Sequence, residues 1–303
     1  MTLAAPADGT LAAIAAYGLA GSRRSLPGAA LDPAAWDALV TLCAARHLVG
    51  LLSAAVAAGE VALPDERRDA FADLTGRVAD RSRAAGRAAV AGSAALAEAG
   101  IDHRVLDGPA VVDRVFRDPH RRPVEAVEVL VAPSALGAAG ALTGDPVRVC
   151  SEALPHGLGA RVRLADLSEP PVDVEVDGGR LPAVALDAAL VRSCARAAGG
   201  GADHVVALRD VAQMALSGPV DGDLVRSRAA DWRCTAVVAW AVARAWQAFD
   251  LADRTELSVW AERYEPEPAE RRALLSPARS GAPHRRVAGV AHRWARVLRR
   301  DHP

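Results

Sequence analysis

The sequence predicts an α+β protein, with a mixed sheet at the centre of the chain between two helical regions. Of its 303 residues 51% are hydrophobic but only 4% are aromatic, and alanine supplies much of the apolar share, which favours alanine-rich helices. Residues 101–180 instead alternate short β-branched runs with short helical segments, as a helix-covered sheet requires. We therefore expect a helical region at 1–100, a sheet-bearing core at 101–180 and a second helical region at 181–303.

Two helix starts stand out in the first helical region. Asp32 is a candidate N-cap, and Pro33 suits the first position of the helix that follows. Asp65 is a second candidate cap, and it opens a long helix that extends to Ala99. Gly100 is expected to end that helix.

The core is predicted to contain four strands separated by turns and two short helices. Two consecutive glycines are expected to stop the last strand, and the chain is expected to be helical again from Pro182 onward. A loop-like stretch at 266–283 separates these helices from a final basic helix at 284–300. The predicted strands lie within 101–108, 124–132, 147–154 and 170–178, and the later helices within 186–197, 205–216 and 229–251.

Composition excludes several classes of function. The net charge of −1 gives no overall attraction to nucleic acid or to a membrane surface. The four cysteines form no CxxC pair, so structural zinc and a disulfide framework are not expected, and a reducing cytoplasm is the predicted location. The N-terminus has no basic segment typical of a signal peptide, and no uninterrupted apolar run reaches about 18 residues.

Acidic side chains alternate with valines on two of the predicted strands. Glu128 shares a face with Ala126, and Asp173 shares a face with Glu175. If the two strands are neighbours, the three carboxylates converge, where they could bind Mg²⁺ or, without a cation, keep one proton for acid–base chemistry. The alternative is that they are solvent-facing residues of half-exposed strands.

Residues 106–131, LDGPAVVDRVFRDPHRRPVEAVEVLV, resemble an uncharacterised nucleotidyltransferase family of the DNA polymerase beta-like superfamily. That family typically shows a Lys-Gly turn, an Asp-Pro, an Arg-Pro and an Asp-x-Asp strand ending in Leu-Val. The matching positions here are Gly108, Asp118-Pro119, Arg122-Pro123 and Leu130-Val131, followed by Asp173 for a third carboxylate and by His204 and Asp210 in the helical region. The resemblance implies a minimal nucleotidyltransferase-like sheet core.

The chain departs from this family at the positions that would hold metal and phosphate. Ala126 stands where the family has its first metal-binding aspartate, and Glu128 stands where it has the second. Asp107 replaces the lysine before the turn glycine, and Pro109 lacks the backbone N–H that another residue would offer to a phosphate. These changes remove electrostatic stabilisation of the transferring group, of order several kcal/mol, so ordinary nucleotidyl transfer is not expected.

The predicted catalytic residues are therefore Asp107, Glu128, Asp173 and Glu175 in an acidic pocket without its metals, a setting that suits proton transfer. Three further residues are predicted to bind substrate: Gly108, Arg122 and His156. Arg122 alternatively pairs with an acid in a structural role, and His156 alternatively lies in a solvated loop. Asp210, amid apolar neighbours, is expected to form buried hydrogen bonds.

Three functions follow from these observations. The first is a small-molecule step in the specialised metabolism of a bacterium, performed by the repurposed acidic pocket without a cofactor. The second is a non-catalytic binding or scaffold protein on the same fold. The third is residual nucleotidyl transfer with one Mg²⁺ held by Glu128 and Asp173. The basic helix at 284–300 is expected to dock onto the body or onto a second copy, with an anionic partner as its alternative.

Overall fold

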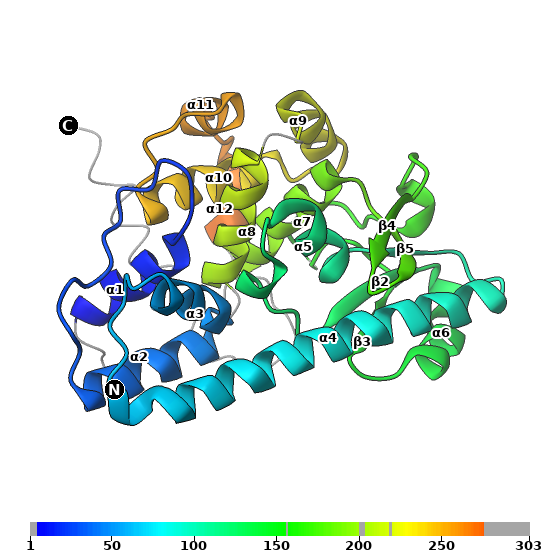
Figure 1. Cartoon of the computed structure of the whole chain (residues 1–303). Helices are drawn as coiled ribbons and strands as arrows, with labels where there is room; N and C mark the ends of the chain where they lie inside the picture. The colour runs from blue at the N-terminus through cyan, green and yellow to red at the C-terminus, as the bar shows by residue number, and fades with distance from the viewer. Residues whose placement is uncertain (1–4, 156, 200–203, 218–219, 276–303) are drawn as a thin grey trace.

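In the computed structural model the chain folds as one mixed five-stranded sheet with helices around it, which confirms the α+β prediction (Figure 1). The structure describes residues 5–275, apart from 156, 200–203 and 218–219. None of the helices among these residues is both long and apolar enough to cross a membrane. The predicted basic helix at 284–300 lies outside the described residues.

The strands lie in the order β3-β2-β1-β5-β4. The β1–β2 and β4–β5 pairs are antiparallel, whereas β1–β5 and β2–β3 are parallel. Because β3 and β4 are at opposite edges, the chain between them, residues 151–171, has to return from one edge of the sheet to the other. The strands are β1 (His103–Val105), β2 (Val127–Val131), β3 (Val147–Cys150), β4 (Val172–Val176) and β5 (Gly179–Ala183).

The fifth strand, β5, was not predicted. The preceding strand, β4, does end just before the two glycines, in a turn where Asp177 and Gly178 both have positive φ, of 48° and 79°. The prediction that the chain is helical again from Pro182 is wrong, because Gly179 begins a further strand and the next helix begins at Leu186. The chain then reverses, and β5 pairs with all five residues of β4. Pro182 lies inside β5, between two neighbouring strands, a position that a proline seldom occupies.

The two faces of the sheet have different surroundings. Residues paired across strands point to the same face, so Val127, Val129 and Val105 share one face and Glu128 and Leu130 share the other. The valine face packs on the long helix α4 (Arg68–Glu98), which lies below the strands in Figure 1 with α6 (Leu136–Thr143) beside it. The face that carries Glu128 is therefore the one turned away from α4.

Small residues let α4 lie close to α6 and to the sheet. A Cβ on Gly92 would be 3.3 Å from Thr143, and a Cβ on Gly179 of β5 would be 2.2 Å from Val90. At the same contact the buried Ser93 hydroxyl lies 2.7 Å from the imidazole Nε2 of His103. The opposite ring nitrogen, Nδ1, faces the Ile101 carbonyl at 3.0 Å, so both buried polar groups are satisfied.

The N-terminal helices begin largely as predicted. Asp32 caps α2, accepting a hydrogen bond from the Ala35 N–H at 2.8 Å, and Pro33 is its first residue. Asp65 is not a cap, because a short 3₁₀ turn (Asp65–Arg67) begins at that residue and precedes α4. Gly100 follows α4 with a φ of 69°. The other helices of this region are α1 (Ala5–Ala16), α2 (Pro33–Ala45) and α3 (Val49–Ala57).

The C-terminal helices form a second layer in which α7, α8 and α10 contact one another. The stretch 229–251, predicted as one helix, is broken between α9 and α10, where Arg233 has a φ of 51°. A helix also occupies part of the stretch 266–283 that was predicted as a loop. These helices are α7 (Leu186–Gly199), α8 (His204–Leu216), α9 (Gly222–Asp231), α10 (Thr235–Phe249), α11 (Glu256–Arg263) and α12 (Pro268–Leu275).

Candidate functional site

Asp107, the first of the predicted catalytic acids, lies in the turn directly after β1. Its Oδ1 accepts a hydrogen bond from the backbone N–H of Glu128 at 3.0 Å. The preceding bond of the ladder runs from the Leu106 N–H to the Glu128 carbonyl at 2.9 Å. The side chain thus takes the place of a backbone carbonyl at the end of the β1–β2 ladder. Asp107 and Glu128, which the sequence predicted to share a pocket, are brought together by this pairing.

Two arginines of α7 complete the group. The Oδ2 atom of Asp107 accepts from a terminal nitrogen of Arg192 at 2.9 Å and from one of Arg196 at 3.0 Å. Arg192 also forms an ion pair with Glu128 and donates its Nε–H to the carbonyl of Ala153 at 3.0 Å. Because Arg192 and Arg196 are one helical turn apart, both side chains leave α7 on the same side.

Arg192 is buried, and burial lowers the pKa of its guanidinium, an effect that the Asp107 carboxylate opposes. Burial, together with the negative charge of Asp107, raises the pKa of the nearby Cys150 thiol to about 11. A buried guanidinium costs much less free energy when each of its three nitrogens contacts an acceptor, as in Arg192. The two acids are therefore the partners that keep Arg192 inside the molecule.

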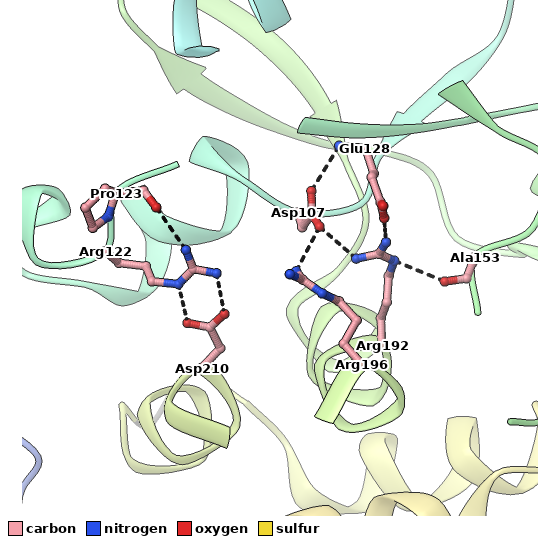
Figure 2. Close-up of polar contacts among 8 residues, drawn as sticks. All are labelled: Asp107, Arg122, Pro123, Glu128, Ala153, Arg192, Arg196 and Asp210. Atoms are coloured by element: carbon pink, nitrogen blue, oxygen red, sulfur yellow. Dashed lines mark hydrogen bonds and ion pairs between the residues drawn. The ribbon is translucent and has the colours of Figure 1, made fainter. Parts of the chain in front are cut away.

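Figure 2 shows a second pair beside this group, formed by Arg122 and Asp210. Two nitrogens of Arg122 reach the two Asp210 oxygens, each at 2.8 Å, and a third donates to the Pro123 carbonyl at 3.0 Å. Both side chains are about one-tenth exposed. This geometry is the structural alternative considered for Arg122, and it places Asp210 in the buried hydrogen-bonding role that was expected.

These two groups lie along the boundary between the sheet and the C-terminal helices. Asp107, Arg122 and Glu128 belong to the sheet region, whereas Arg192, Arg196 and Asp210 belong to α7 and α8. We call these six residues the polar seam. Every carboxylate in it faces at least one guanidinium, so the three negative charges are matched by three positive charges.

Gly108, predicted to bind substrate, lies at the start of α5 (Pro109–Val115) with a φ of 73°. This backbone conformation favours glycine, and a Cβ there would be 3.2 Å from Val127. The role of Gly108 in the structure is to turn the chain sharply from Asp107 into a short helix. Pro109 occupies the first helical position, where its missing N–H leaves no bond unmade.

Asp173 and Glu175 do not join Asp107 and Glu128. The prediction that they converge required β2 and β4 to be neighbours, but β1 and β5 lie between them. Three strand spacings separate the two strands by roughly 14 Å. Asp173 and Glu175 are exposed on the edge strand, opposite Pro182 and Arg180 of β5. The alternative of solvent-facing strand residues therefore describes these two acids.

The remaining predicted residue, His156, lies outside the described residues. Within the part of the chain that the structure describes, no group of three or more His, Cys, Asp or Glu side chains could hold a metal ion. Arg192 and Arg196 were not among the predicted site residues. Their signal was two arginines four residues apart on a helix whose neighbouring residues, such as Leu190 and Cys194, are buried.

Two hollows on the described surface lie away from the acids of the seam. A small one of about 30 Å³ is lined by residues that include His47, Val78 and Glu125. A groove of about 650 Å³ lies between α9 and α11. Neither is lined by a residue of the polar seam.

Comparisons with protein-family models, curated proteins and solved structures returned no match.

Proposed function

We propose that this protein is a non-catalytic binding protein whose core resembles a nucleotidyltransferase fold and whose former acid site has become a structural element. The observation that carries this proposal is that both carboxylate oxygens of Asp107 already accept hydrogen bonds from within the protein. The two oxygens accept from the Glu128 backbone and from two guanidinium groups. A carboxylate that already accepts three hydrogen bonds has little capacity left to bind a metal ion or to take a proton from a substrate.

The second support is the position of the hollows. An acid–base enzyme needs its acids at the wall of a cavity that holds the substrate. Glu128 is the most exposed of the three seam acids, with one-third of its side-chain surface accessible, yet it lines neither hollow described above. An open groove away from the acids fits a binding protein better than it fits an enzyme that uses them.

The proposal is tested by looking for the activity that the acids would support. The purified full-length protein is incubated with each nucleoside triphosphate, with and without Mg²⁺, and pyrophosphate release is measured beside the Glu128→Gln variant. We expect no release above that of the variant, and no rise in the melting temperature on adding Mg²⁺. Mg²⁺-dependent release that Glu128→Gln abolishes would show that the seam is catalytic.

A further inference from the structure

The groove between α9 and α11 has a composition of its own. Figure 1 shows these two helices at the top of the molecule. The groove is lined by residues of both helices and of the segment that leads into α11. Its lining includes Arg226 of α9, Arg254 of the connecting segment, and Val259, Trp260 and Arg263 of α11. The groove is wide open to solvent, and its volume of about 650 Å³ leaves room for a small molecule.

Positive charge dominates the lining, with three arginines against one acid, Glu256. Arg226 is paired with Asp223, and Arg254 with Glu262, but the acid of each pair is more than half exposed. Exposed pairs of this kind contribute little to stability, so a bound anion can replace the acid at small cost. Arg263 is exposed and has no ion pair within the described chain.

Trp260 gives the groove an aromatic wall. It is half-buried, and its ring lies 5.6 Å from that of Tyr264, centre to centre, at an interplanar angle of 50°. Val259 adds an aliphatic surface beside it. A half-buried indole next to several guanidinium groups offers one surface for a flat apolar ring and donors for an oxyanion.

We propose that this groove binds a small organic anion that carries an aromatic ring, with the ring against Trp260 and the phosphate or carboxylate among Arg226, Arg254 and Arg263. Guanidinium groups bind both kinds of oxyanion in the same bidentate way, so the shared chemistry is an aromatic ring joined to an oxyanion. The groove shares no residue with the polar seam, so its ligand is independent of whether the seam is catalytic.

The test is calorimetric titration of the full-length protein with 1-naphthyl phosphate and with 1-naphthoate, two probes that differ only in the oxyanion. Uncharged 1-naphthol and inorganic phosphate supply the ring and the anion separately. We expect saturable binding of at least one of the two joined probes, at least about tenfold tighter than that of either separate part. The tighter of the two joined probes identifies the oxyanion that the groove prefers.

Variants locate the binding. Arg263→Gln, at an exposed position, is expected to weaken the preferred probe about tenfold or more, and Trp260→Leu to weaken it without changing the preference between phosphate and carboxylate. Arg77→Gln, an exposed arginine of α4, is the matched control and should leave binding unchanged. The proposal is overturned if neither joined probe binds, if inorganic phosphate binds as tightly as they do, or if Arg77→Gln weakens binding as much as Arg263→Gln.

Discussion

Arg192 connects α7 to three separate parts of the sheet region. Its guanidinium meets a carbonyl of the segment after β3, the carboxylate after β1 and the carboxylate on β2, so one side chain fixes three parts of the sheet region. Removing one partner of such a buried network leaves the others desolvated and unpaired, which costs more than the network contributes in total. Arg192 is therefore the residue on which the seam should be tested.

Arg192→Met keeps the length of the side chain and removes its charge and donors. We expect the free energy of unfolding to fall by about 3 kcal/mol. The Glu128 carboxylate and the Ala153 carbonyl each lose the guanidinium as a partner, and the Oδ2 atom of Asp107 keeps Arg196 but loses Arg192. Urea unfolding measures the change. Arg161→Met is the control, since Arg161 is largely exposed and should change stability by no more than about 0.5 kcal/mol. Equal stability of the two variants would contradict a structural role for the seam.

At the scale of residues, the sequence pointed to the acids but not to their partners. Alternation on a strand shows which side chains share a face, so Glu128 could be placed on the side opposite the valines. Arg192 and Arg196 follow Asp107 by 85 and 89 positions. Nothing local in the sequence shows that they contact it in the folded chain. That contact depends on how α7 packs on the sheet, which is a tertiary property.

Among the elements, α3 illustrates how closely the backbone segments approach one another. Gly50 lies in its first turn, facing the segment that leads to Arg122. A Cβ at this position would be 2.2 Å from the His120 carbonyl oxygen, which is backbone and cannot rotate away. Glycine is therefore needed at position 50 for packing, although it is a poor helix former.

Gly50→Ala should consequently destabilise the protein, by about 1–3 kcal/mol, even though alanine favours the helix. Gly76→Ala is the matched control, because Gly76 lies in the interior of α4 with open space around its missing Cβ. That substitution should raise the free energy of unfolding by up to about 1 kcal/mol. The change in the free energy of unfolding, measured by thermal and urea unfolding, has opposite signs in the two variants if the packing argument holds. It has the same sign in both if helix propensity alone decides the stability.

The element that sequence reasoning missed, β5, shows a limit of local signals. Its five residues include a glycine and a proline, both of which argue against a central strand. The strand forms because β4 pairs with it along its whole length, whereas β1 pairs with it only at Val105 and Ala183. The long helix α4 was predictable for the opposite reason, since its pattern extends over 31 residues.

For the whole molecule, the contacts predict that the sheet and the helical layers unfold together. Helix α4 covers the sheet, and the polar seam joins the sheet to α7 and α8. All the tryptophans lie outside residues 101–183, and Trp36, Trp240, Trp246 and Trp260 belong to α2, α10 and α11, so a change in their fluorescence reports on those helices. Hydrogen exchange of peptides from 101–131 reports on the sheet.

We expect the two probes to give the same urea midpoint, and Arg122→Met to lower both midpoints equally, because Arg122 and Asp210 form a buried pair between the layers. A sheet that unfolds at a different urea concentration from the helices would show that the seam does not couple them. A fall in the fluorescence midpoint alone would confine the effect of Arg122 to the helical side.

The strand order also has a consequence for synthesis on the ribosome. The parallel partner of β1 is made only when Ala183 emerges, 78 residues after Val105, and Arg192 emerges later still. Until then a growing chain presents β1 with an unpaired edge and Asp107 without its counter-charges. We therefore expect the yield of native protein to depend on the speed of translation across residues 106–192, or on a chaperone that shields the chain during this interval.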